Sequence, residues 1–255
     1  MTRIKNIIQE FLKWQWTLWI LFLFLYTWKL KSNLMGVQSV LGVSINLWDF
    51  MLEFFVNPLL FIYFLFPIFL ISFCKTILQN GEYMILLRLH SYKRWIFFMV
   101  GKVIPPIIVF LFIWVLVSLI VSLPSPLQLS WSEYATNDFG MNYLVFELQQ
   151  YFIHPYIAVL LQIIQYFAFL ITVHVVISTF YLIWPKNSTL IILASSIYFL
   201  TIITYKMFND WDWIQISNYI FTYYSITDLN SAYLPLLFLF IIFISCLLII
   251  NLFKK

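Results

Sequence analysis

The residues best placed to contact a partner through charge are concentrated between Asn80 and Lys102, with long apolar runs on both sides. Only 9% of the chain is charged, yet this stretch holds Glu82, Arg88, His90, Lys93, Arg94 and Lys102. Asn80–Gly81 is a turn signal, and the Glu82 carboxylate that follows would complement the N-terminal dipole of a short helix. Such a helix can lie across a surface and dock into a groove on a partner. Alternatively, the charges belong to a solvated loop and only set the topology of its neighbours.

Polar side chains inside the apolar runs are the second place to look for function. His174 is an ionisable residue within such a run, where it either serves a proton or substrate or forms a neutral hydrogen bond between helices. Gln162 and Gln165 share one helical face, and His174 lies on the opposite face at 100° per residue. We expect the glutamines to join helices; a translocation path lined by Gln162, Gln165 or His174 is the alternative.

The sequence carries no recognisable catalytic or cofactor motif. A membrane protease or lipid-modifying enzyme needs paired acids or histidines within the spans, and the acids of this chain lie at the rims. Gly101-Lys102-Val103 lacks the remaining residues of a phosphate-binding loop. Cys74 and Cys246 have no cysteine or histidine partner at metal-binding spacing. We therefore expect a non-enzymatic chain with no metal site, no catalytic residue and no ATP of its own.

The elements that must position these residues are membrane helices. The chain has 255 residues, of which 64% are hydrophobic and 22% aromatic, with a mean hydropathy of +0.95. A soluble fold could not cover so much apolar surface with so few polar residues. The expected fold is an all-α polytopic membrane protein, a single transmembrane domain over residues 1–255. Six apolar runs are long enough to span a bilayer, at 14–30, 56–74, 103–123, 156–184, 189–205 and 232–252.

The distribution of basic residues predicts the orientation of these spans, because cytoplasmic segments carry an excess of Lys and Arg. With both termini inside the cell, three of the fourteen basic residues lie outside: Lys29, Lys31 and Lys206. The others lie inside: Arg3, Lys5, Lys13, Lys75, Arg88, Lys93, Arg94, Lys102, Lys186, Lys254 and Lys255. We therefore expect a multi-pass protein of the cell membrane with cytoplasmic ends and a cytoplasmic segment 80–94.

The N-terminal residues 2–13 alternate apolar and charged side chains with helical periodicity. The apolar residues recur at helical spacing: Ile4, Ile7, Ile8, Phe11 and Leu12. This pattern predicts an amphipathic helix in the inner headgroup layer. A cytoplasmic continuation of the first span is the alternative.

The order of residues in the segment 80–94 resembles the cytoplasmic loop of ABC-2-type transporter permeases. The resemblance lies in Glu82, Leu87-Arg88, Ser91, Arg94-Trp95 and Lys102. It implies a short coupling helix that contacts a separate ATPase subunit through Glu82, Leu87, Arg88, Ser91, Lys93 and Arg94. Trp95 and Lys102 would anchor the chain at the membrane interface. His90 and Tyr92 depart from the small or apolar residues usual in such loops.

The resemblance implies a permease subunit of an ATP-driven exporter, in which ATP and Mg²⁺ belong to the partner ATPase. A second permease subunit, identical or different, would complete the path through the lipid membrane. In size and in its Ile-, Phe- and Leu-rich composition the chain is similar to Gram-positive exporters of amphipathic peptide toxins or lantibiotics, such as the phenol-soluble modulin exporters. The alternative is an ion-coupled secondary transporter, because Pro67 and Pro105-Pro106 could kink two of the spans.

Overall fold

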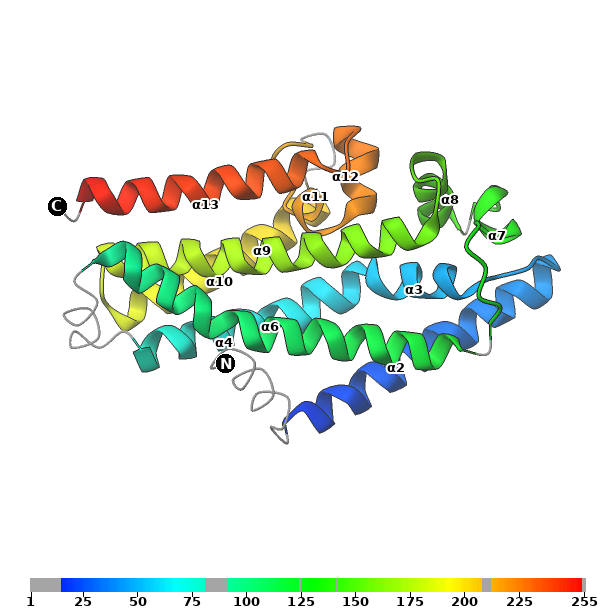
Figure 1. The fold of residues 1–255 in the computed structure, drawn as a ribbon, viewed down its shortest axis with the longest axis horizontal. Coiled ribbons are helices and arrows are strands. Elements are labelled where there is room, and N and C mark those ends of the chain that lie inside the picture. Colours follow the sequence, from blue (N-terminus) through cyan, green and yellow to red (C-terminus); the bar gives the residue numbers. More distant parts are fainter. Residues whose placement is uncertain (1–14, 81–90, 124, 141, 208–211, 254–255) are drawn as a thin grey trace. The chain divides into compact units, whose positions relative to one another are not determined.

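The computed structural model describes residues 15–80, 91–123, 125–140, 142–207 and 212–253 (Figure 1). This part of the chain is all-helical, with 83% of residues in helices and no strand. Up to α6, the elements are α2 (Gln15–Leu41), α3 (Leu47–Phe55), the π-helix η1 (Leu59–Leu65), α4 (Phe66–Asn80) and α6 (Tyr92–Ser122). They continue with α7 (Glu133–Thr136), α8 (Tyr143–Tyr151), α9 (Pro155–Ile183), α10 (Asn187–Met207), α11 (Ser217–Ile220), α12 (Thr222–Leu229) and α13 (Leu234–Phe253).

Several of these helices are long and apolar enough to cross a membrane. Within the described residues there are four: Leu59–Gln79, Tyr92–Ser122, Pro155–Ile183 and Asn187–Met207. A fifth is counted if α12 and α13, which meet at a bend of 103°, form one broken span. The chain is therefore a helical membrane-spanning protein, as its composition predicts. The predicted spans 156–184 and 189–205 match α9 and α10 to within two residues at each end.

Residues 15–30 of the first predicted span, 14–30, belong to the longer helix α2, which is not among these candidate spans. Lys29 and Lys31 lie in the middle of α2, so this helix continues well past the predicted end of the span at residue 30. The Lys31 side chain is only 6% exposed, and its Nζ donates a hydrogen bond of 2.6 Å to the carbonyl oxygen of Val121. The last four carbonyls of a helix have no partner within it, so Lys31 caps the C-terminal end of α6.

Two helices begin at residues that differ from the predicted span boundaries, and both differences have a local cause. The second span does not begin at Val56, because α3 ends at Phe55 and the chain restarts as a helix after Pro58, which has no N–H to continue the first helix. The third begins at Tyr92 instead of 103, since Lys93, Arg94 and Lys102 lie within α6. The last three residues of the predicted coupling helix 80–94 thus belong to α6. The predicted interfacial helix 2–13 lies outside the described residues.

The described chain forms two compact units. One contains residues 1–57, 108–164 and 221–232. In it, α2 packs on α6 through Trp16 and Trp19, whose rings lie 6.5 and 6.3 Å from that of Phe110. One turn further along the same face of α6, the Phe55 ring of α3 lies 4.8 Å from Trp114. Aromatic packing thus joins α2, α3 and the second half of α6.

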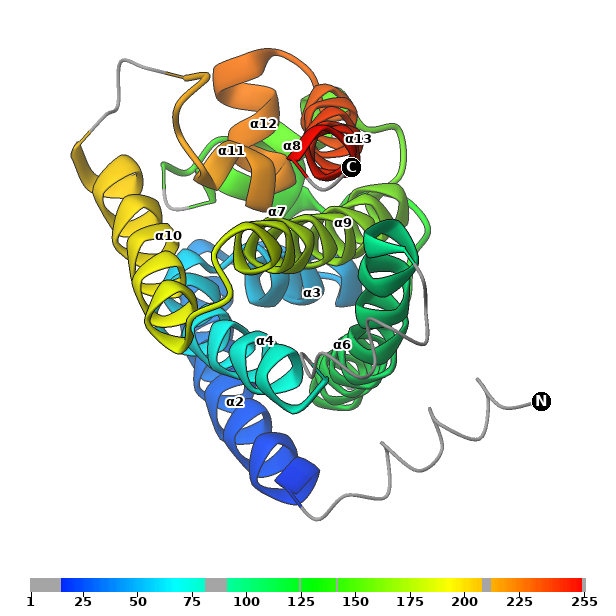
Figure 2. The same cartoon turned by 90° about the vertical axis from the view of Figure 1, so that its left-hand side faces the viewer.

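The other unit contains residues 58–107, 165–220 and 233–255. Its centre is a stack of rings from η1 and α9, with Phe61 and Tyr166 4.3 Å apart and nearly parallel. Phe66 at the start of α4 lies 5.4 Å from Phe169 of α9. Within this unit α4 also lies beside α10 (Figure 2). Packing of α9 and α10 on α4 therefore fixes the helix that leads into the segment 80–94.

The cap that Lys31 provides on α6 generates a stability prediction. Lys31→Met removes the hydrogen bond to Val121 and should lower the free energy of unfolding by about 1–3 kcal/mol, the usual cost of losing a charge-assisted bond. Unfolding of the purified protein in detergent, followed by circular dichroism, measures the change. Lys29→Met is the matched control, because Lys29 is exposed on the same helix and its loss should change stability by less than about 0.5 kcal/mol. Equal stability of the two variants would contradict the cap.

Candidate functional site

The predicted ATPase-contacting residues lie between the end of α4 and the start of α6. Glu82, Leu87 and Arg88 are outside the described residues. Ser91 precedes α6 and accepts the first intrahelical bond through its carbonyl oxygen, 3.1 Å from the Trp95 backbone nitrogen. Lys93 and Arg94 follow in the first turn of α6, and both are exposed. The described end of the segment therefore presents two adjacent cations on the first turn of a membrane-spanning helix.

The two predicted interface anchors have different surroundings. The Trp95 side chain is 1% exposed, so its indole packs among its neighbours in place of lying at an open surface. Lys102 is exposed within α6, with its Nζ 5.4 Å from the ring centroid of Phe98. The ring attracts the ammonium, and the apolar stem of Lys102 can lie along the helix. The charged end of Lys102 can thus stay in water.

Both predicted path glutamines bond to backbone groups. In the first unit, the buried Gln162 Oε1 accepts a hydrogen bond of 2.9 Å from the Thr222 N–H, at the N-terminus of α12. In the second unit, the buried Gln165 Nε2 donates a bond of 3.1 Å to the Asn218 carbonyl of α11. Backbone groups at helix ends lack intrahelical partners, and leaving them unpaired when buried is costly. The glutamines thus satisfy backbone groups at helix termini, and their part in a translocation path stays a prediction.

His174 lies inside the second unit, with no exposed surface. Its ring is 5.1 Å from that of Phe73 on α4, and its Nε2 is 3.5 Å from the Ser178 hydroxyl, one turn along α9. A separation of 3.5 Å is at the limit of a hydrogen bond. His174 therefore contacts α4 through Phe73, and a proton or substrate role for it stays a prediction.

A pair of carboxylates on α3, Asp49 and Glu53, forms a polar cluster, where the sequence predicted only acids at the rims of the spans. Asn46 caps α3: its Oδ1 accepts bonds from the N–H groups of Trp48 and Asp49, and Asp49 Oδ2 accepts one from the Asn46 N–H. This reciprocal pairing is a capping box. The spacing Asn46-x-x-Asp49 ahead of an apolar run is a helix-start signal that could have located α3 from sequence.

Tertiary contacts surround the same carboxylates. Asp49 is completely buried, and the Ser132 hydroxyl before α7 also donates to it. Glu53, one turn further along α3, accepts a bond of 3.4 Å from the Tyr134 hydroxyl. The buried Asn142 donates to the backbone carbonyl of Tyr134 and holds α7 in place. The cluster thus ties α3 to the segment between α6 and α8.

The charges of this pair are energetically unfavourable where they lie. Burial raises the pKa of Asp49 to about 6, although its bonds from Ser132 and Asn46 act in the opposite direction. Burial, together with the Asp49 charge, raises the pKa of Glu53 to about 7, against the bond from Tyr134. The pair can therefore take up or release protons near neutral pH. Among the described residues, no group of three or more His, Cys, Asp or Glu could hold a metal ion.

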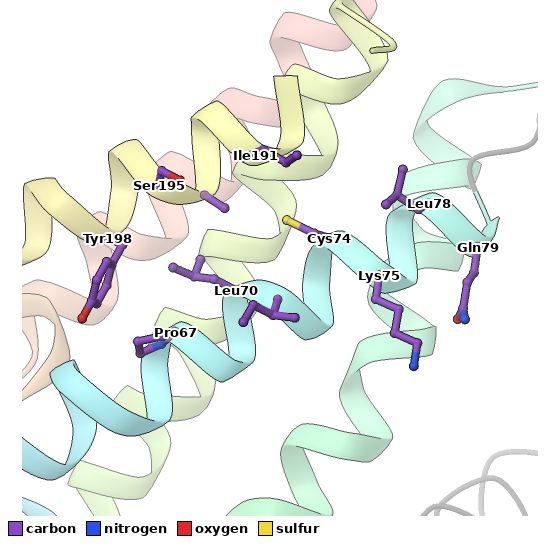
Figure 3. A pocket seen from close by; sticks show the side chains of 11 residues that line it. Pro67, Leu70, Cys74, Lys75, Leu78, Gln79, Ile191, Ser195 and Tyr198 are labelled. Atoms are coloured by element: carbon purple, nitrogen blue, oxygen red, sulfur yellow. The ribbon is translucent and has the colours of Figure 1, made fainter. Parts of the chain in front are cut away.

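A groove lies between α4 and α10 in the second unit. We call it the α4/α10 groove; it has a volume of about 480 Å³. Its lining residues are Pro67, Leu70, Ile71, Cys74, Lys75, Leu78, Gln79, Ile191, Ala194, Ser195 and Tyr198. Figure 3 shows Cys74 directed towards α10, with Lys75 and Gln79 on the C-terminal part of α4. The volume is within the range of small-molecule sites.

The raised carboxyl pKa values predict how stability depends on pH. Carboxyls whose pKa is raised on folding hold more protons in the folded state between about pH 4 and pH 7. Their stabilising contribution is complete below about pH 4 and is lost as the pH rises through 6 to 7. Asp49→Asn keeps a cap acceptor but no charge, and should reduce this loss by roughly 1–3 kcal/mol.

Unfolding in detergent at a series of pH values measures the slope, which is the change in the free energy of unfolding with pH. Asp138→Asn, at an exposed carboxylate in the same unit, should keep the wild-type slope. If Asp49→Asn also keeps it, the Asp49 carboxyl is not desolvated as described.

Comparison with known proteins adds no relative: no family model, no curated protein and no solved structure matches the chain. A function must therefore be inferred from three features of the chain. These features are the basic segment between α4 and α6, the carboxylate pair on α3 and the α4/α10 groove.

Proposed function

We propose that this chain is the permease subunit of an ATP-driven exporter of the cell membrane, and that a separate cytoplasmic ATPase docks on the segment 80–94. The observation that carries the proposal is the position of this segment. It joins the C-terminus of α4 to the N-terminus of α6, two helices fit to span the membrane, and it ends with the exposed cations Lys93 and Arg94. A partner that moves this segment acts on two spans at once.

The topology of the proposal has six spans with both termini in the cytoplasm. The first span lies in α2, from residue 14 to about 30, and the last is α13. Lys31 is then satisfied inside the protein by its bond to Val121, which lowers the cost of a cation near the external end of a span. This arrangement keeps most Lys and Arg residues inside, as the orientation rule requires.

The helices that flank the segment contain irregular points where movement could be absorbed. The π-helix η1 precedes α4, after a break at Asn57–Pro58, and α6 contains Pro105 and Pro106. Bends and hinges in helices are usual at π-helical turns and prolines. ATP-driven closure of two ATPases would tilt the inner parts of α4 and α6 about these points. Two permease subunits, identical or different, would open a path for an amphipathic or hydrophobic peptide, consistent with the aromatic-rich chain.

One observation favours a second candidate, an ion-coupled secondary transporter. Such proteins need ionisable groups that bind and release a proton or cation, and Asp49 and Glu53 have pKa values raised towards neutrality. The pair lies on α3, which is too short to span a membrane, and it carries the capping box of that helix. A structural role thus already accounts for the burial of Asp49.

The two candidates differ in their energy source. The tagged full-length chain, purified in mild detergent from its native membrane, should retain an ATPase with a phosphate-binding loop, and ATP should drive peptide transport by the reconstituted complex. Purification without any ATPase, combined with peptide transport driven by an ion gradient alone, would establish the secondary transporter instead.

Two substitutions test the docking segment directly. Glu82→Ala and Arg88→Ala should each lower the amount of ATPase recovered with the chain several-fold, because charged contacts at an interface commonly contribute 1–3 kcal/mol. Quantitative mass spectrometry of the purified complex measures the ratio of ATPase to permease.

Lys186→Ala is the matched control, since Lys186 is an exposed cation that precedes α10, outside the segment. It should leave the ratio unchanged. Wild-type ATPase recovery in both segment variants, with normal membrane insertion, would refute the docking assignment.

A further inference from the structure

The α4/α10 groove is almost entirely apolar along its length. Its walls are aliphatic side chains of α4, such as Leu70 and Ile71, and the face of α10 that carries Ile191 and Ala194. Ser195 and Tyr198 continue this face of α10. A site of this kind suits a flexible hydrocarbon chain better than a polar or charged ligand. The ligand would therefore be at least partly aliphatic.

The groove is accessible from the surface of α10 in the described part of the chain. Only 17% of the spanning window of α10 is buried, whereas the other three candidate spans are 50–61% buried. Side chains along α10 are accordingly exposed, among them Ile192, Phe199 and Leu200. In a membrane-spanning helix, such apolar side chains face lipid. Lipid chains are thus the molecules present at the highest concentration beside the groove.

The end of the groove nearest the segment 80–94 differs from the rest, because it is polar and positive. Lys75 and Gln79 line it, and both are exposed on the last two turns of α4. Cys74 beside them lies 3.8 Å from the Leu190 carbonyl in the first turn of α10, so the N-terminus of that helix reaches the same level. A helix N-terminus carries partial positive charge, so α10 adds to the positive character of this end, although the Lys75 side chain itself extends away from α10 (Figure 3). This end complements an anion.

We propose that the α4/α10 groove binds an anionic phospholipid. One acyl chain lies along Leu70, Cys74 and Ile191, and the phosphate lies at the Lys75 ammonium. Lys75 is suited to this position, because a lysine near a helix end extends its apolar stem along the helix and places its ammonium at headgroup level. The bound lipid would contact α4 directly before the segment 80–94. The proposal does not depend on an ATPase partner.

Native mass spectrometry of the full-length protein in detergent tests this site. The probes are phosphatidylglycerol and phosphatidylcholine with identical acyl chains, titrated separately, and the measured quantity is the Kd of the first bound lipid. We expect phosphatidylglycerol to bind about fivefold more tightly, the ratio expected for one basic residue at an anionic headgroup. Lys75→Gln should abolish this preference, and Lys29→Gln, at an exposed lysine of α2 outside the groove, should keep it.

A second pair of variants tests the apolar part. Ser195→Phe places a ring in the groove and should weaken the binding of both lipids at least fivefold. Ser196→Phe, at the next exposed position of the same helix, should leave both Kd values unchanged. Equal affinity for the two lipids in the wild type would overturn the proposal, as would a preserved preference in Lys75→Gln. Dimers that disappear only in Ser195→Phe would show that a second copy of the chain occupies the groove, and would also overturn it.

Discussion

The structure depends on one constraint: a chain surrounded by hydrocarbon must satisfy its backbone N–H and C=O groups internally wherever a helix begins or ends. Long helices satisfy most of these groups by themselves, and the few polar side chains of the protein serve the remainder. Asn46 and Asp49 cap the start of α3, Gln162 binds the first N–H of α12, and Lys31 caps the end of α6. In so apolar a chain, a buried polar residue is first of all a partner for backbone.

This constraint separates structural charges from those available for function. Lys31 is buried and its ammonium has a carbonyl partner, whereas Lys75, Lys93 and Arg94 are exposed. The exposed cations belong to the last turns of α4 and the first turn of α6, where they can contact headgroups or a docked protein. Asp49 and Glu53 combine both roles, since they hold α3 in place and yet have pKa values that burial raises towards neutrality. A transport protein with such a pair would respond to pH even if ATP supplies its energy.

The hydropathy pattern located two long apolar helices closely, and it failed for the helix starts and contacts that depend on charged residues or on packing. The runs of α9 and α10 were located closely, because Pro155 and Pro185 interrupt a long apolar stretch at the points where these helices begin or end. The start of α6 was missed because Lys93 and Arg94 were assigned to a separate coupling helix, 80–94, although a helix tolerates cations on an exposed face. Helix α3 was not predicted, because it carries two acids and lies between the first two apolar runs, and only its capping-box spacing indicates it. The contacts of Gln162 and Gln165, and the groove formed by α4 and α10, depend on which helices pack together, and a hydrophobic pattern does not specify this.

The central claim is that the segment 80–94 lies on the cytoplasmic side, where an ATPase can reach it. Labelling of a Ser91→Cys variant, in which Cys74 and Cys246 are replaced by serine, tests this directly with a membrane-impermeant maleimide. The account predicts labelling in inside-out membrane vesicles and none in intact cells. Labelling from outside intact cells would contradict it, because no cytoplasmic ATPase could then contact the segment.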